Sequence, residues 1–319
     1  MGNKRVFYAC QGLALDGEPL RGVQNVSVRT ENNNHVVDEW GTHKIYNHYV
    51  DTPRSTISLS RIMTFGGHPV ATGSITGSGN AITTNHGRKL CLYFVSDTAE
   101  TGVHSSSKTQ NYVFFKNVSI NSISYGMTTD GYLTEDIEFI SYYKAYNSGE
   151  CDISSMDSLK KNVQEEDGYD GRPIKRENIS SVTGGGDLIQ SFNVNIPFNI
   201  QTVDEFGTAF SRDSKKYRYA TYPIATSYSV TEIYQSGGFD TIEFGDHKIN
   251  CDNIDLPKQS TQKIVTCSGV GFYLELGNCN LESMEYGGGD TSGGNATITY
   301  NYTCYNSGLL LDSAPSGTV

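Results

Sequence analysis

The chain has 319 residues, 36% of them hydrophobic and 18% charged, with 34 glycines, 21 tyrosines and a formal net charge of −11. The negative charge and the lack of a Lys/Arg cluster argue against general attraction to nucleic acid or to an anionic membrane. The length predicts two domains of ordinary size, and the composition favours β-sandwiches or barrels with many turns over helical bundles.

Alternation of apolar and polar residues predicts β-strands through the first half of the chain. We expect strands at residues 6–14, 24–30, 54–62, 89–96, 112–123 and 133–146. Residues 126–131 (Gly-Met-Thr-Thr-Asp-Gly) have the chemistry of a hairpin turn between the last two strands.

Residues 148–187 do not follow this pattern. Met156, Leu159 and Val163 have the spacing of one face of a short amphipathic helix at residues 155–166, which is the one helix that we expect. Glycine-rich residues after it, at 167–171 and 183–187, predict a linker.

The alternation returns in the second half. We expect strands at residues 192–196, 227–231, 263–276, 278–286 and 296–303, with a glycine-rich hairpin turn before the last one. Residues 312–319 are expected to form a loose tail.

The second half also repeats short strings of the first. Tyr-x-x-Tyr-Asn-Ser-Gly occurs at residues 143–149 and at 302–308, and Asp-Glu-aromatic-Gly occurs at 38–41 and at 204–207. Pro53 and Pro223 each open an alternating run. Asn117, Ser122, Tyr125 and Gly126 match Asn278, Ser283, Tyr286 and Gly287 at one offset (278 − 117 = 161).

These matches keep their order, so they predict a tandem duplication, in which the Tyr-x-x-Tyr-Asn-Ser-Gly string ends the final strand of each domain. The predicted organisation is a first β domain at 1–149, a linker with a short helix at 150–187, a second β domain at 188–311 and the tail at 312–319. The fold class is therefore mainly β, with two tandem sandwich or half-barrel domains.

The seven cysteines are odd in number and lack Cys-x-x-Cys spacing. This pattern favours small buried hydrophobic residues in a reducing compartment over a disulfide framework or a zinc site. The first residues lack the hydrophobic region of a secretory leader, and no apolar run approaches a membrane span. We therefore expect folding in a cytoplasm.

No catalytic, cofactor-binding or metal-binding residue is predicted, and we expect no enzyme activity and no cofactor. His43 and His48 lie five residues apart in an extended segment, which favours surface histidines over a metal site. The acidic residues at 165–170 could bind calcium, but without a twelve-residue ligand loop a solvated acidic loop is favoured. Glycine triplets at 184–186 and 287–289 are interpreted as turns.

Two aromatic patterns have alternative interpretations. A row of tyrosines could stack on sugar rings, or could pack between domains or subunits, which we favour. Those tyrosines are Tyr142, Tyr143, Tyr146, Tyr300, Tyr302 and Tyr305. The strings at 38–41 and 204–207 are interpreted as turns whose aromatic residue fills the core while the acids face a neighbour.

Several strings in the first half resemble bacteriophage tail tube proteins. They are Val-Gln-Asn-Val-Ser-Val at 23–28, Trp40-Gly41, Ile45-Tyr46, and Thr-Pro-Arg-Ser-Thr-Ile-Ser-Leu-Ser-Arg-Ile at 52–62. The resemblance implies a β-sandwich-like or half-barrel domain whose strands join neighbours into rings. Such rings stack into a tube in the virion, through which the genome and the tape-measure protein pass.

Two domains in each chain indicate a ring of three chains with pseudo-sixfold symmetry. A ring of six chains, each with one domain outside, is the alternative, and a surrounding sheath is left open. Small hydroxyl faces at residues 56–60 and 227–231 would suit a lumen along which DNA slides. The other functions considered are a tail-tip or baseplate hub component and a carbohydrate-binding double β-sandwich.

Overall fold

The computed structural model describes a mainly β protein, as the sequence predicts. The described residues are 11–32, 34–38, 40, 45–50, 53–65, 67, 69–75, 88–95, 110–146, 151, 171–186, 188–203, 217–234, 260–267, 271–288, 295–305 and 308–312. The one helix in this part of the chain is a 3-10 turn at Arg176–Asn178. The helix expected at 155–166 lies outside the described residues.

Twenty strands make up the described chain. The first half, here residues 11–146, contains β1 (Gln11–Leu15), β2 (Glu18–Pro19), β3 (Val23–Glu31), β4 (Asn34–Asp38), β5 (Ile45–Val50), β6 (Arg54–Ile62), β7 (Gly73–Ser74), β8 (Arg88–Val95), β9 (Gln110–Thr128), β10 (Thr134–Ser141) and β11 (Tyr143–Tyr146). The second half, here residues 171–312, contains β12 (Ile179–Val182), β13 (Ile189–Pro197), β14 (Gln201–Val203), β15 (Tyr217–Tyr219), β16 (Ala225–Ile233), β17 (Ser260–Thr266), β18 (Tyr273–Gly287), β19 (Thr297–Tyr305) and β20 (Gly308–Leu311).

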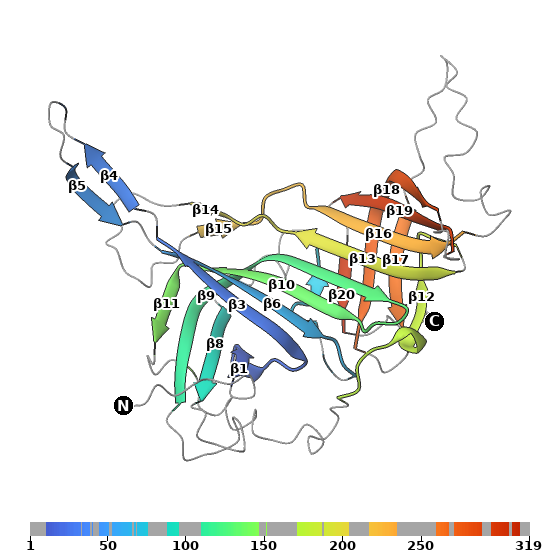
Figure 1. The fold of residues 1–319 in the computed structure, drawn as a ribbon, viewed down its shortest axis with the longest axis horizontal. Coiled ribbons are helices and arrows are strands. Elements are labelled where there is room, and N and C mark those ends of the chain that lie inside the picture. The colour runs from blue at the N-terminus through green and yellow to red at the C-terminus, as the bar shows by residue number, and fades with distance from the viewer. Residues whose placement is uncertain are drawn as a thin grey trace.

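Eight strands follow one another in the order β3-β6-β10-β9-β13-β16-β19-β18 (Figure 1). Every neighbouring pair is antiparallel. Because β9 of the first half pairs with β13 of the second half, both halves belong to one continuous sheet.

The two halves have the same strand order. In the first half it is β3-β6-β10-β9, and β9 also pairs with β8 and β11. In the second half it is β13-β16-β19-β18, and β18 also pairs with β17 and β20. Each half also has a separate hairpin in the chain between the first two strands of this order: β4–β5 between β3 and β6, and β14–β15 between β13 and β16.

Irregularities in the ladders also recur at matching residues. Gln24 and Gln190 (190 − 24 = 166) are each the extra residue of a bulge at the start of β3 and β13. Each glutamine donates a side-chain hydrogen bond to the carbonyl two residues earlier, Gln24 to Gly22 O at 3.1 Å and Gln190 to Leu188 O at 3.3 Å. A bulge of this kind bends a strand and fixes its register.

The long strands β9 and β18 bend at a matching asparagine. Asn117 and Asn278 have φ angles of 52° and 51°, a left-handed conformation that asparagine tolerates better than most residues. Before the bend, β9 pairs with β8 and β11. After it, apart from Val118, which faces Arg88 of β8, it pairs with β10 and β13. The asparagine match found in the sequence therefore marks a backbone requirement.

Three local expectations are wrong. The strand expected at 263–276 is interrupted, because the Thr266 hydroxyl donates to Phe272 O across a loop between β17 and β18. The strand expected at 133–146 breaks at Tyr142, where the Ser141 hydroxyl donates to Lys116 O at 2.8 Å and accepts from Tyr143 N at 3.2 Å. Such side-chain bonds compete with the ladder.

The repeated Tyr-x-x-Tyr-Asn-Ser-Gly string does not occupy equivalent places, which is the third error. Its first copy begins as β11, whereas Tyr302 lies inside β19 and faces Leu281 of β18. The residue of the first half in that position is Phe139, which faces Ile120 of β9. Moreover, β20 begins at Gly308, so the second copy does not end the last strand.

The cysteine prediction is wrong as well. Cys91 is bonded to Cys151, and Cys279 of β18 is bonded to Cys304, which faces it in β19. Cys267 is free and half-buried. Each bond joins residues that only the fold brings together, 60 and 25 positions apart in the chain, so local spacing gave no signal.

The main hydrophobic core includes residues of both halves. At their junction the rings of Tyr125 in β9 and Phe272 lie with centroids 4.9 Å apart, and neither side chain is exposed. A smaller cluster surrounds the Cys91–Cys151 bond. The core therefore lies on one face of the eight-stranded run, and the other face is not covered by it.

Candidate functional site

The face of the eight-stranded run opposite the core is lined with short polar side chains. Alternation along β6 shows how this arises, because Ile57 and Leu59 are buried while Ser58 is exposed. One row that crosses all eight strands consists of Asn25, Ser60, Asp136, Ser124, Asn195, Ser227, Thr303 and Asn280. None of these eight side chains is buried.

Hydrogen bonds between neighbouring strands hold several of these side chains. The Ser124 hydroxyl donates to Asn195 Oδ1 at 2.9 Å across the β9–β13 junction. The Thr231 and Thr299 hydroxyls lie 2.9 Å apart, on β16 and β19. Short side chains that form hydrogen bonds with one another leave few polar groups available to bind a ligand.

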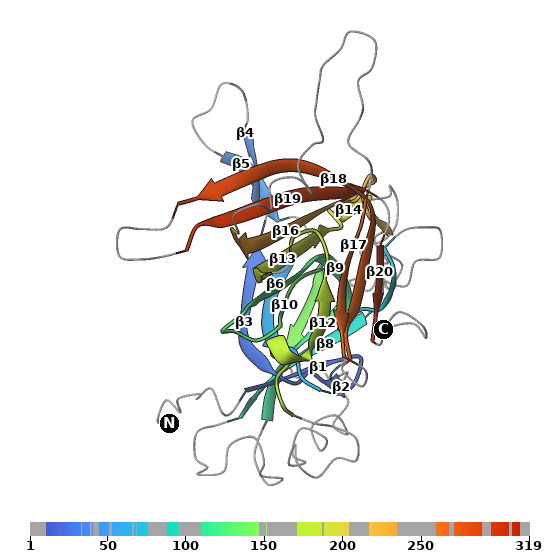
Figure 2. The same cartoon turned by 90° about the vertical axis from the view of Figure 1, so that its right-hand side faces the viewer.

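The charge on this polar face is acidic. From β10 to β19 the described residues of the face include Asp136 and Glu138, and none of them is Lys or Arg. Toward the ends of the run the face also carries Arg29 and Glu31 on β3, Arg54 on β6 and Glu285 on β18. From β10 to β19 the described residues of the face therefore offer no cation to phosphate groups. Figure 2 shows the strands of the face, from β3 in blue to β18 in orange, following one another around a curved surface.

The sheet has an open edge at each end of the run. In the described part of the chain, β3 pairs only with β6. Residues Ser283–Gly287 of β18 pair only with β19, because β17 and β20 reach only the part of β18 up to Cys279. Unpaired backbone groups on such an edge can accept another strand.

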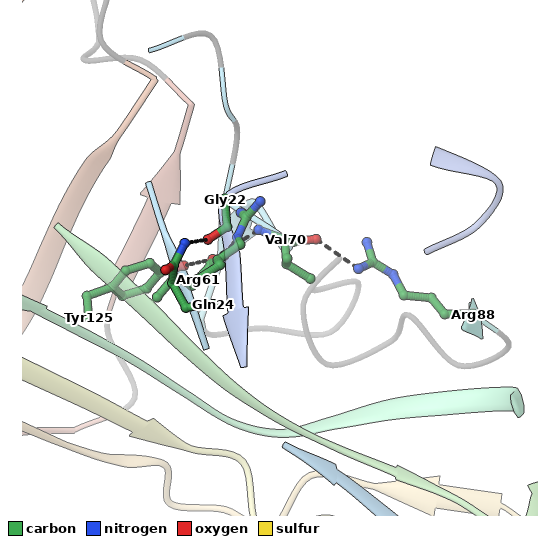
Figure 3. A network of polar contacts seen from close by, with 7 residues as sticks. Gly22, Gln24, Arg61, Val70, Arg88 and Tyr125 are labelled. Atoms are coloured by element: carbon green, nitrogen blue, oxygen red, sulfur yellow. Dashed lines mark hydrogen bonds and ion pairs between the residues drawn. The ribbon is translucent and has the colours of Figure 1, made fainter. Parts of the chain in front are cut away.

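A buried polar network braces the first half (Figure 3). Glu135, with no exposed surface, forms an ion pair with Arg61, which is 5% exposed. Glu135 Oε1 accepts from the Tyr125 hydroxyl at 2.7 Å and from Val70 N at 3.0 Å. Burial raises the pKa of Tyr125 well above its ordinary value, and the Glu135 carboxylate adds to the shift. Nearby, Arg88 donates to Val70 O at 2.8 Å.

The second half replaces this network with a different one. Glu232 occupies the position of Arg61 in the strand order, and its cross-strand neighbour is Ile298. Its carboxylate accepts from the Tyr300 hydroxyl at 2.8 Å and from Gly186 N. The carboxylates of Glu135 and Glu232 both accept hydrogen bonds from groups of the chain itself. Neither network therefore contains the free nucleophile or base of a catalytic site.

The tyrosines of the predicted row differ in their exposure to solvent. Tyr300 and Tyr302 are only 2% and 6% exposed, and the Tyr302 hydroxyl donates to Gly184 O at 2.9 Å. Burial and the Glu232 carboxylate raise the pKa of Tyr302 to about 12. Tyr146, at the end of the short strand β11, is 67% exposed, and Tyr305, at the end of β19, is 39% exposed. Strand alternation places Tyr300 and Tyr302 in the core. The sequence pattern alone could not distinguish this core face from a ligand-binding face.

The expectation that Trp40 fills the core is wrong. Its side chain is fully exposed, at 102% of the reference area, between β4 and β5. Figure 1 shows this hairpin standing away from the other strands. Phe206, its match in the second half, lies outside the described residues.

The other sequence candidates add no site. His43 and the acidic residues at 165–170 lie outside the described residues, as does the side chain of His48. Gly184 has a φ of 95° in a bend, which fits the interpretation as a turn. Among the described residues there is no group of three potential metal ligands. In the same residues, no helix has the length and apolar character needed to cross a membrane.

Comparisons with known proteins do not assign the chain to a family. No protein-family model matches it, and no curated protein is similar to it. The polar face and its two open edges are therefore interpreted from the geometry alone.

Proposed function

We propose that the chain is a structural subunit of a bacteriophage tail tube. Its two halves are tandem copies of one tube-like β unit, and chains join into rings that stack around a channel. The observation that carries this proposal is the polar, acid-biased face that continues through both halves and has an open strand edge at each end.

The matching strand orders support two copies of one unit. Both halves have the same bulged glutamine and the same left-handed asparagine, at Gln24 and Gln190 and at Asn117 and Asn278. Independent strands would have no reason to share these irregularities. The units correspond to the predicted domains at 1–149 and 188–311. In addition, β12 pairs with β17, which brings residues of the predicted linker into the second unit.

The chemistry of the polar face supports a channel lining. DNA that passes through a tube must slide without adhering, and its phosphates bind chiefly to Lys and Arg. Hydroxyl and amide side chains with a few carboxylates neither attract nor trap it. The tape-measure protein would occupy the same channel before ejection.

The pairing of β9 with β13 favours a ring of three chains over one of six. Both units of a chain lie in one sheet, so neither is held aside from the other. Three chains would then contribute six units around the axis, with pseudo-sixfold symmetry. The disulfides are compatible with a virion, whose surface is an oxidising environment in which such bonds persist.

Electron microscopy of the purified full-length chain over a range of concentrations tests this function. We expect hollow rods of stacked rings, and native mass measurement of a single ring should give three chains. Single rings that never stack would favour a tail-tip or baseplate hub. Compact monomers at every concentration would refute both structural functions, and retention on a glycan array would then support a carbohydrate-binding protein.

A further inference from the structure

The junction between the two halves is a template for a junction between chains. Inside the chain, β13 adds antiparallel to β9, from Ser191 facing Thr128 to Pro197 facing Ser122. It pairs with the edge of β9 that β10 leaves open. In the second half, the corresponding edge belongs to Ser283–Gly287 of β18, and no described strand pairs with it.

The strand that corresponds to β13 is β3, whose outer edge is also open in the described chain. The two strands correspond at an offset of 166, set by their bulged glutamines (190 − 24 = 166). The strands β9 and β18 correspond at an offset of 161, set by their left-handed asparagines (278 − 117 = 161).

With these offsets, the register of β13 on β9 within the chain gives the register expected for β3 of one chain on β18 of another. Ser124 faces Asn195 inside the chain. The corresponding residues are Glu285 (124 + 161 = 285) and Arg29 (195 − 166 = 29), which are both on the polar face. An anion and a cation thus replace a neutral pair that is joined by a hydrogen bond of 2.9 Å.

We propose that β3 of a second copy of this chain adds antiparallel to Ser283–Gly287 of β18, with its Arg29 facing Glu285. This inference rests on the proposed function, because it requires two equivalent units in each chain. Repetition of the same head-to-tail contact closes a ring and leaves neither edge open.

The charges at the two edges support this register. The Arg29 side chain is 80% exposed and, in the described part of the chain, forms an ion pair with Glu31 of its own strand at 2.8 Å. An exposed pair of this kind contributes about 0–1 kcal/mol, so Arg29 can turn to Glu285 at little cost. Opposite charges facing each other across strands favour one register over its neighbours.

The apolar side supports the same register. Tyr125 faces Val194 in the internal junction, and neither is exposed. The corresponding residues are Tyr286 (125 + 161 = 286) and Val28 (194 − 166 = 28). Tyr286 is 54% exposed in the single chain, and an added strand would cover this aromatic surface as β13 covers Tyr125. Burial of apolar area contributes to association.

Cysteine cross-linking in the assembled full-length protein tests the register. The double variant R29C/E285C should form a disulfide between chains, and the cross-linked species should include a closed ring. R29C alone and E285C alone control for reaction with native cysteines. N25C/E285C places the first cysteine four residues out of register. All substituted side chains are exposed, so circular dichroism should be unchanged.

Charge reversal gives a second readout. R29E and E285R should each raise the concentration needed for assembly by about tenfold or more, since like charges then face each other. The double reversal R29E/E285R should restore most of the loss. Restoration would distinguish the facing pair from a general charge effect.

The two failures can be told apart. Assembled rods that do not cross-link through R29C/E285C, or that cross-link equally through N25C/E285C, would overturn the register and leave the tube function standing. Unmodified chains that never assemble would overturn the tube function, and the proposed junction with it.

Discussion

The buried ion pair of the first half provides a sharp test of the structure. Substitution of Glu135 with glutamine, E135Q, keeps the size of the side chain but removes its charge. Arg61 would then keep its charge in a site where it is only 5% exposed. Removal of one partner from a buried ion pair costs about 3–5 kcal/mol, because the other charge remains without compensation.

The neighbouring contacts support a value in this range. Glu135 has no exposed surface and also accepts hydrogen bonds from Tyr125 and from Val70 N. A glutamine can still accept one of these bonds through its carbonyl, so most of the expected loss comes from the guanidinium charge of Arg61, which loses the Glu135 carboxylate. The double variant R61L/E135L removes both charges and should recover most of the stability, because apolar replacement of a buried pair is often neutral.

Urea unfolding followed by circular dichroism measures the effect at one fixed protein concentration. With a slope of about 3 kcal/mol per molar urea, a loss of 3–5 kcal/mol lowers the midpoint by about 1 M or more. The half-exposed pair of Lys263 with Glu275, at 3.1 Å, provides a matched control. The variant K263M should lose less than about 1 kcal/mol.

A midpoint for E135Q within the range of K263M would refute the reasoning, since it would mean that Arg61 reaches water or another anion. A double variant that is no more stable than E135Q would show that the network stabilises the fold through its geometry rather than its charge balance.

Two further predictions concern the cysteines and the tyrosines. C91S should lower the free energy of unfolding by about 4 kcal/mol, which is the loop-entropy value for a disulfide between residues 60 apart. Free-thiol labelling should also reveal the released Cys151. Unchanged labelling would contradict the Cys91–Cys151 bond. The pKa of Tyr302 is raised to about 12 from an unfolded value near 10. The stabilisation that this shift contributes is fully present below pH 10 and is lost as the tyrosine ionises. The free energy of unfolding should therefore fall between about pH 10 and pH 12. The loss is roughly 2–3 kcal/mol for a shift of two pKa units. Tyrosinate absorbance during alkaline unfolding checks it, and Y302F should reduce the pH dependence.

Local sequence patterns were sufficient for most strands. The run from Arg54 to Ile62 is confirmed as β6, because alternation of β-branched and small polar residues reflects a sheet with one face in the core. The match of Asn117 with Asn278 was also visible, because a left-handed bend restricts the residue types that a strand accepts at that point. The small hydroxyl residues of β6 and β16 could be named in advance for the same reason.

Side-chain identity alone could not separate ligand surfaces from core. Tyr300 and Tyr302 alternate with polar residues as a binding row would, yet their rings are buried and their hydroxyls bond within the chain. Trp40 was expected inside and is exposed. In both cases the outcome depends on which other strands cover the residue.

The sequence by itself determined the β class, the positions of most strands and the repetition of short strings, because these follow from periodicities of a few residues. Only the tertiary structure decided that β9 pairs with β13, that Cys91 bonds to Cys151, and that the repeated tyrosine string is not equivalent in the two halves. The first two features depend on contacts between residues 60 or more positions apart in the chain, and the third depends on the pairing of β18 with β19. Such contacts are fixed by the packing of the whole sheet and leave no periodic signal in any short segment.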